Sequence, residues 1–161
     1  MKKNNFLNKF KYKLLNLKEL KKKIGDINRK NKVVMCHGNF DIVHPGHIRH
    51  LVYAKSKAPI LIVSITSDLM ISKGKYKPHV PEKLRAFNLA ALEIVDYVLI
   101  DKNETPLESL NYLKPNYYAK GFEYSNFSNF KTKGEKKIVQ NYGGKIIFTP
   151  GDLIYSSTKI I

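Results

Sequence analysis

The chain has 161 residues, of which 43% are hydrophobic and 26% charged. These values are typical of one globular domain and exclude a wholly disordered chain. No apolar run reaches the ~18 residues of a membrane-spanning helix, and we expect no secretory leader. The single cysteine, Cys36, excludes an internal disulfide and a cysteine-rich metal site. We therefore expect a cytoplasmic protein with no membrane partner.

The net charge of +16 is concentrated at the amino-terminal end. Residues 1–32 contribute +10 and residues 33–161 only +6, and just three of the 29 basic residues are arginines. Lysine is less suited than arginine to bidentate phosphate recognition, so we expect a solvated surface and no nucleic-acid partner. A basic nucleic-acid-binding module that uses residues 1–32 is the alternative from a different class, and it predicts steeply salt-dependent binding.

The first elements of the chain are an arm and a capped helix. Residues 1–15 are polar and lysine-rich without a clear period, which predicts a basic flexible arm. Asn16 and Glu19 form a capping-box pattern, followed by an apolar stripe to residue 27, which predicts a helix. We expect residues 16–161 to form one domain, and we hypothesise that it belongs to a longer polypeptide.

After residue 32, short apolar runs alternate with segments of helical spacing. Runs typical of buried strands lie at 33–36, 60–65, 97–100, 117–119 and 146–148. Helical spacing is found at 48–52, 84–94, 107–113 and 135–142, whereas 122–134 is expected to be a flexible loop. The alternation predicts an α/β fold, a Rossmann-like parallel sheet with helices on both faces. The ligand crevice of such a sheet lies at the carboxyl ends of its strands.

The segment at 37–48, HGNFDIVHPGHI, follows the first expected strand. Gly38 allows the backbone to approach a ligand closely. His44 and His47 flank a Pro-Gly pair at a helix start, where unpaired N–H groups and the helix dipole favour phosphate. Two such imidazoles can donate together to oxygens on one phosphorus. Zinc would need more ligands than this segment offers, so we expect no protein-bound metal, and we expect His50 on the helix surface.

This segment resembles the HxGH signature of the nucleotidyltransferase superfamily, which includes cytidylyltransferases and adenylyltransferases. The resemblance covers residues 16–161, and further matching segments occur in the family order at 64–68, 72–78, 85–98, 114–121 and 155–158. Within the superfamily, the chain most resembles the nucleotidyltransferase domain of ADP-heptose synthase-type proteins, which is often fused to a ribokinase-like sugar kinase. Residues 120–124 read KGFEY where that group tends to have Lys-Gly-Gly-Asp-Tyr.

The resemblance implies transfer of a nucleoside monophosphate from a triphosphate to a phosphorylated acceptor, with release of pyrophosphate. The implied catalytic residues are His44, His47 and Lys73. The implied nucleotide-binding residues are Gly38, Asn39, Phe40, Asp41, Arg85, Lys120, Gly121, Glu123, Tyr155, Ser156, Ser157 and Thr158. Of these, the backbone amides of Asn39 and Phe40 would cradle phosphates. Arg85 and the backbone of Lys120 and Gly121 would border the base. Asp41 either caps the next turn or helix or orients the loop.

The implied partners are ATP or CTP and a small phosphorylated sugar or alcohol, with Mg²⁺ on the triphosphate. The favoured interpretation is a sugar-phosphate adenylyltransferase, like those that act on heptose 1-phosphate. The alternative is a cytidylyltransferase that acts on glycerol 3-phosphate or a similar phosphorylated alcohol. A degenerate relative without activity is disfavoured because His44, His47, Lys73 and Thr158 are all retained. Relatives of this fold commonly pair, so we expect a homodimer.

Overall fold

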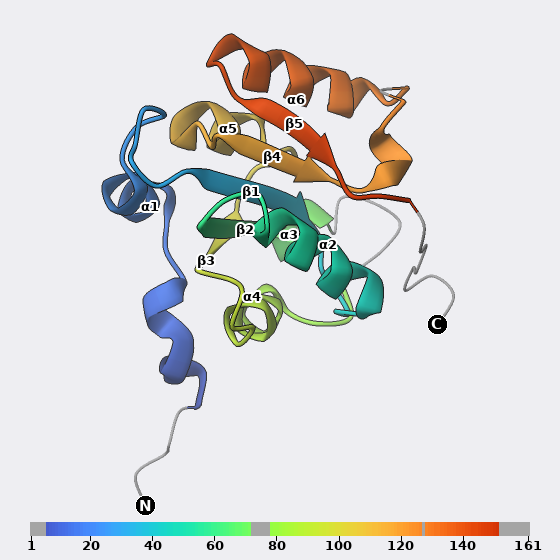
Figure 1. Ribbon diagram of the computed structural model, residues 1–161. Coiled ribbons are helices and arrows are strands. Elements are labelled where there is room, and N and C mark those ends of the chain that lie inside the picture. Colours follow the sequence, from blue (N-terminus) through green and yellow to red (C-terminus); the bar gives the residue numbers. More distant parts are fainter. Residues whose placement is uncertain (1–5, 72–77, 127, 152–161) are drawn as a thin grey trace, which may run out of the picture.

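The computed structural model describes residues 6–71, 78–126 and 128–151, and it contains one five-stranded parallel sheet (Figure 1). The strands run in the order β3-β2-β1-β4-β5. Their bounds are β1 (Val33–Gly38), β2 (Ile60–Thr66), β3 (Tyr97–Asp101), β4 (Tyr117–Lys120) and β5 (Lys145–Phe148). Each expected strand is confirmed, because continuous apolar runs are the signature of strands covered on both faces.

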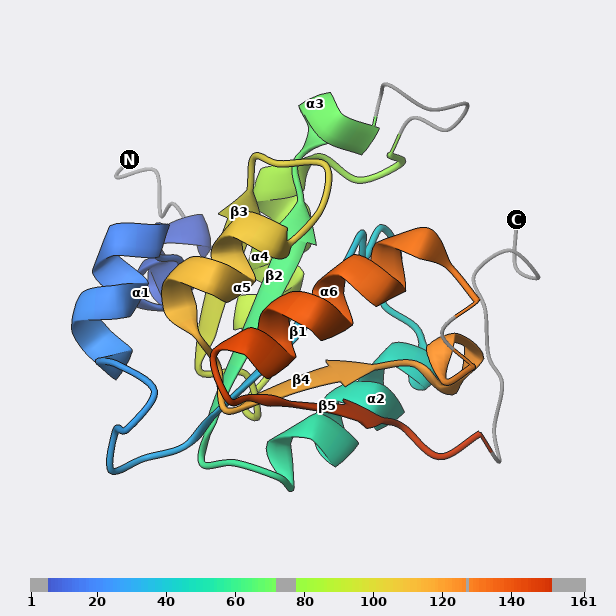
Figure 2. The same ribbon diagram turned by 90° about the horizontal axis from the view of Figure 1, so that it is seen from above.

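Helices cover both faces of this sheet (Figures 1 and 2). Their bounds are α1 (Leu17–Ile24), α2 (Pro45–Lys55), α3 (Asp68–Ile71), α4 (Glu82–Ala90), α5 (Leu107–Leu113) and α6 (Phe130–Asn141), with 3₁₀ turns η1 (Phe6–Lys13) and η2 (Phe122–Tyr124). The predicted capping box starts α1, where Asn16 Oδ1 accepts from Glu19 N at 3.0 Å and the Glu19 carboxylate accepts from Asn16 N at 2.8 Å. The predicted α/β, Rossmann-like architecture is confirmed.

Alternation along the central strands divides the core into two layers. Val34 and Cys36 of β1 pack in the layer that contains α2 and α4. Val33 and Met35 pack in the opposite layer, with α1, α5 and α6. All four side chains are fully buried, so a register slip of one residue would exchange two apolar faces rather than expose one. Cys36 lies inside the core, as expected for an inert thiol.

Residues 6–15 differ from the expected flexible arm, because this part of the chain packs on the domain. The Lys13 ammonium donates to the carbonyl oxygens of Leu92 at 3.1 Å and Val95 at 2.7 Å. The ring centroids of Phe10 and Phe87 are 5.6 Å apart. A 3₁₀ segment has three residues per turn, so its few anchoring side chains leave no α-helical period in the sequence.

Residues 122–134 also differ from expectation, since they contain η2 and the first turns of α6. Asn129 caps α6, and its side chain accepts from the backbone N–H of Lys131 at 2.8 Å. The helix therefore begins at Phe130 instead of residue 135. The start of α6 was not predicted from the sequence, because Phe130 is 88% exposed and is not part of an apolar stripe.

Candidate active site

The site lies where the sheet reverses its strand order. β1 is central, with β2 on one side and β4 on the other, and all three are parallel. In such a sheet, the loops at the carboxyl ends of the two strands flanking the reversal diverge and leave a crevice. The loop from β1 to α2 starts at this point and carries the HxGH residues.

His44 is the N-cap of α2 and is 92% buried by area, with 8% of its surface exposed. Its Nδ1 accepts a hydrogen bond from the backbone N–H of Gly46 at 3.1 Å. Pro45 follows at the first helical position, where its lack of an N–H has no cost. Burial lowers the pKa of His44, so the ring is neutral at pH 7. Because Nδ1 is an acceptor, the ring proton belongs on Nε2, which is left as a donor.

His47 stacks directly on His44, with ring centroids 3.8 Å apart and an interplanar angle of 28°. Burial, and after it the proximity of His44 and His50, lowers the pKa of His47 to about 4, and the Ile42 carbonyl acts the other way. Nδ1 of His47 is buried without a hydrogen bond of normal geometry. Nδ1 is therefore enclosed by protein, so a ligand would contact His47 through Nε2.

Phe40 gives the loop its shape. Its backbone has φ +47°, the left-handed region that non-glycine residues rarely adopt. The ring is 5% exposed and lies 4.9 Å from the His47 ring, centroid to centroid. A Cβ at Gly38 would lie 3.1 Å from the Phe40 ring. Gly38 therefore leaves room for the phenyl ring that packs against His47. The sequence predicts that Gly38 lets the backbone approach a ligand, and it does not predict this contact.

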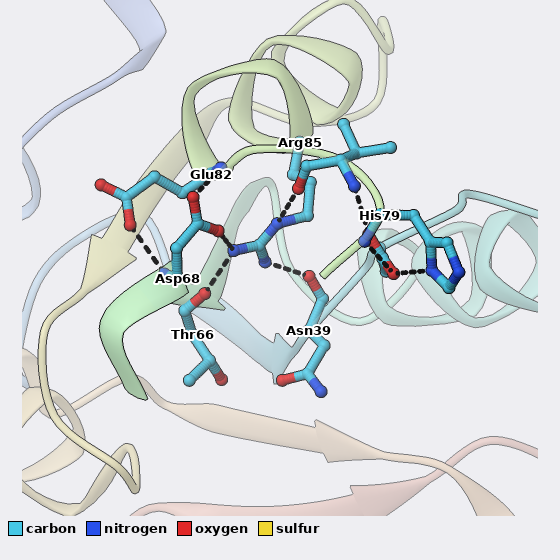
Figure 3. Close-up of polar contacts among 8 residues, drawn as sticks. Asn39, Thr66, Asp68, His79, Glu82 and Arg85 are labelled. Atoms are coloured by element: carbon cyan, nitrogen blue, oxygen red, sulfur yellow. Dashed lines mark hydrogen bonds and ion pairs between the residues drawn. The ribbon is translucent and has the colours of Figure 1, made fainter. Parts of the chain in front are cut away.

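Arg85, which is expected to border the base, has a completely buried side chain, and Figure 3 shows the protein oxygens around it. Its guanidinium donates to Val80 O at 2.9 Å, Asn39 O at 2.5 Å, Thr66 O at 2.8 Å and Asp68 Oδ1 at 2.7 Å. All three of its nitrogens are thus occupied by protein oxygens. Arg85 joins the β1–α2 loop, the end of β2, α3 and the segment before α4, and it orders the crevice from beneath.

Asp41 also binds the segment before α4, to which Arg85 bonds through Val80. Its carboxylate accepts from His79 N at 2.9 Å, His79 Nδ1 at 2.8 Å and Val80 N at 2.8 Å. Burial alone would raise the pKa of Asp41, but these hydrogen bonds together lower it. Of the two alternatives for Asp41, the structure has the orientation of the loop, and the carboxylate is turned toward protein.

A buried ion pair forms the opposite wall, at the carboxyl end of β4. Lys120 Nζ lies 2.5 Å from Glu135 Oε2, and these side chains are only 11% and 5% exposed. The Tyr118 hydroxyl donates to Glu135 Oε1 at 3.2 Å, and the Tyr124 ring lies 4.5 Å from Lys120 Nζ. Lys120, one of the predicted nucleotide-binding residues, is held here by Glu135, a partner that the sequence analysis missed because no recognisable motif surrounds it.

Gly121 and Glu123 are in direct contact in this wall. A Cβ at Gly121 would lie 2.3 Å from Oε2 of Glu123, so a side chain at 121 would displace the carboxylate. Glu123 itself is exposed, as is Phe122. The substitution of KGFEY for Lys-Gly-Gly-Asp-Tyr is thus accommodated with Phe122 outside the core.

His37, at the end of β1, lies between hydroxyl groups of the neighbouring strand. Its Nδ1 is 3.0 Å from Ser64 Oγ, and its Nε2 is 3.3 Å from Thr66 Oγ1. Burial lowers the pKa of His37 to about 4; Asp101 acts to raise it and Lys120 to lower it. Both ring nitrogens have protein partners, so His37 supports the floor of the crevice.

We expect the stability of the protein to fall below pH 6.5. His37, His47 and His50 have pKa values lowered to about 4, in each case first by burial, against about 6.5 in an unfolded chain. The unfolded chain therefore binds these protons more tightly, and stability present above pH 6.5 is lost as the pH falls toward 4. Urea unfolding followed by circular dichroism should give a lower midpoint at pH 5 than at pH 7.5. An equal or higher midpoint at pH 5 would contradict the burial of neutral histidines.

Five predicted residues lie outside the described residues: Lys73, Tyr155, Ser156, Ser157 and Thr158. Within the described ranges, no cluster of three or more His, Cys, Asp or Glu side chains could hold a metal ion. In the same ranges, no helix has the length and apolar character to cross a membrane.

A parallel sheet of this order, with two stacked neutral imidazoles at a helix N-terminus beside its reversal point, is an α/β arrangement suited to binding phosphate groups. The family comparison makes the class specific. The cytidylyltransferase-like family matches residues 35–161. The chain belongs to this family and is a nucleotidyltransferase, which confirms the resemblance stated above.

Curated relatives match one domain of larger proteins. Bifunctional protein HldE of Pelobacter propionicus is 35% identical over 122 residues, which is 73% of this chain and 24% of that protein. HldE of Helicobacter pylori strain Shi470 is 43% identical over 101 residues, or 62% of this chain and 22% of that protein. The chain therefore spans about a quarter of the length of these relatives.

Solved structures share the fold at low sequence identity. A lipopolysaccharide core biosynthesis protein from Thermoplasma volcanium has a TM-score of 0.64 and 23% identity, covering 74% of this chain and 97% of that one. A pantoate-beta-alanine ligase from Francisella tularensis has a TM-score of 0.63 and 18% identity, covering 92% and 72%. At these identities the likeness concerns the fold alone.

Proposed function

We propose that this domain transfers AMP from ATP to a sugar 1-phosphate, as a heptose-1-phosphate adenylyltransferase does. The observation that carries the proposal is the pair of stacked neutral histidines at the start of α2, where the helix N-terminus favours phosphate. The similarity to HldE proteins supports a sugar phosphate as acceptor. The second candidate is CTP with glycerol 3-phosphate, which the same histidines would serve equally well. The description of the matching family, cytidylyltransferase-like, supports CTP as the nucleotide.

In the proposed reaction, an acceptor phosphate oxygen attacks the α-phosphorus of the triphosphate. The new P–O bond forms as the bond from the α-phosphorus to the bridging oxygen breaks, and pyrophosphate leaves with that oxygen. Because the histidines are neutral, His44 contributes an Nε2–H donor rather than a charge, beside the positive end of the α2 dipole. Catalysis consists of positioning and of stabilising charge on the transferring oxygens.

The remaining proposed contacts surround the triphosphate. The amides of Asn39 and Phe40 would cradle its phosphates, and Lys73 would neutralise the triphosphate or the acceptor. Tyr155, Ser156, Ser157 and Thr158 would complete the binding of the nucleotide. Mg²⁺ would enter as part of the Mg–triphosphate substrate, with phosphate oxygens and water as ligands.

The test is pyrophosphate release from ATP, CTP, GTP and UTP with Mg²⁺, against sugar 1-phosphates and glycerol 3-phosphate. Release that requires ATP and a heptose or hexose 1-phosphate is the expected result. Release that requires CTP and glycerol 3-phosphate would establish the second candidate. Binding of a triphosphate without release from any pair would contradict both acceptor assignments.

A further inference from the structure

His50 is only partly exposed and contacts the chain just after β5, although the sequence predicts a surface residue. It lies on α2 one turn after His47, so His44, His47 and His50 follow one another along one side of the helix. Its Nδ1 is 2.5 Å from Thr149 Oγ1, in the chain just after β5. His50 thus joins the catalytic helix to the far edge of the sheet, a contact that neither the HxGH pattern nor the proposed reaction uses.

Two neighbours place His50 between the phosphate region and the base region. His50 lies close enough to His47, which belongs to the proposed phosphate site, to lower the pKa of His47. Lys120 lies close enough to His50 to add to the effect of burial and lower the pKa of His50. Thr149 also bonds to Lys120, because its backbone N–H donates to Lys120 O at 3.0 Å. The residue after Lys120 is Gly121, which the family resemblance sets beside the base. The part of a nucleotide between its phosphates and its base is the ribose.

The hydrogen-bond chain around Thr149 determines what His50 offers to a ligand. The Thr149 hydroxyl has Lys120 O within donor reach at 3.4 Å, which leaves its oxygen free to accept from Nδ1 of His50. We assign the ring proton to Nδ1 on this network. Burial lowers the pKa of His50 to about 4, so the ring is neutral at pH 7. Nε2 then carries a lone pair, and no described residue donates to it.

An acceptor nitrogen cannot bind a phosphate oxygen, which has no proton to donate, but it suits a hydroxyl group. We propose that Nε2 of His50 accepts a hydrogen bond from a ribose hydroxyl of the bound nucleotide and so selects ribonucleotides over deoxyribonucleotides. The inference rests on the proposed function, since it presumes a nucleoside triphosphate in this crevice.

The test is calorimetric titration of the whole chain with Mg-ATP and Mg-CTP and with their 2′-deoxy and 3′-deoxy analogues. The wild-type protein should bind one deoxy analogue about five- to tenfold more weakly than the ribonucleotide, the size of one hydrogen bond. His50→Phe should bind the ribonucleotide as weakly as that analogue, and its preference should fall to about one. His50→Gln, whose amide offers an acceptor near the position of Nε2, should retain part of the preference.

The ratio of the two affinities separates a ribose contact from a structural role. A loss of packing would weaken both ligands equally and leave the ratio unchanged, so an unchanged ratio in His50→Phe would overturn the inference and leave the proposed function intact. Equal binding of ribo- and deoxyribonucleotides by the wild type would do the same. Failure of the wild type to bind any triphosphate would overturn both. Val52→Ala, at a 52% exposed position of the same helix, is the matched control and should retain the preference.

Discussion

Replacing His47 with alanine is expected to lower kcat about 10²–10³-fold, the usual cost of removing one transition-state hydrogen-bond donor. The substitution removes the ring that stacks on His44 and the buried unpartnered Nδ1. Because no hydrogen bond of normal geometry is lost at Nδ1, the free energy of unfolding should change much less than kcat. The measurement is steady-state pyrophosphate release, with thermal unfolding followed by circular dichroism.

Two amide substitutions show which nitrogen of His47 acts. Glutamine places an amide near the position of Nε2, and asparagine near that of Nδ1. Since Nδ1 is enclosed by protein, a ligand reaches Nε2, and His47→Gln should retain more activity than His47→Asn. Near-full turnover in His47→Ala, with Val52→Ala normal in the same assay, would refute the assigned role.

The strands and helix α2 were predictable because their signals are local. An apolar run between turn residues is typical of a buried strand in an α/β domain, and such a run was enough to predict β1. Likewise, the position of His44 at a helix start was predicted from its neighbours, because a Pro-Gly pair after a capping side chain is typical of a helix N-terminus.

The contacts of Arg85 and His50 were not predictable, because they depend on which distant oxygens surround each side chain. The sequence around Arg85 would be the same whether its guanidinium contacts a base or the carbonyl oxygen of Thr66, which is 19 residues away in sequence. The Thr149 partner of His50 is 99 residues away in sequence. A helical position that is polar in the sequence is usually solvated, whereas the contact with Thr149, just after β5, leaves His50 only partly exposed.

The second large effect is expected at Arg85. Arg85→Lys should lower the free energy of unfolding by on the order of 3 kcal/mol, because one ammonium cannot reach the oxygens of Val80, Asn39, Thr66 and Asp68 together. Each buried oxygen left without a donor costs roughly 1–3 kcal/mol. Urea unfolding of Arg85→Lys and of Lys83→Ala, an exposed neighbour on α4, measures the difference. Equal midpoints for Arg85→Lys and the wild type would contradict this prediction.

The loss should extend to catalysis, because Arg85 orients one peptide of the proposed phosphate cradle. The Asn39 carbonyl points at the guanidinium. In a planar trans peptide the N–H of the next residue points the opposite way, so Arg85 directs the Phe40 amide away from the buried guanidinium, and it restrains a left-handed backbone that is strained without support. Assayed well below its unfolding temperature, Arg85→Lys should therefore show a raised KM for the triphosphate and a reduced kcat. A folded Arg85→Lys with wild-type kcat/KM would mean that the loop keeps its shape without the arginine.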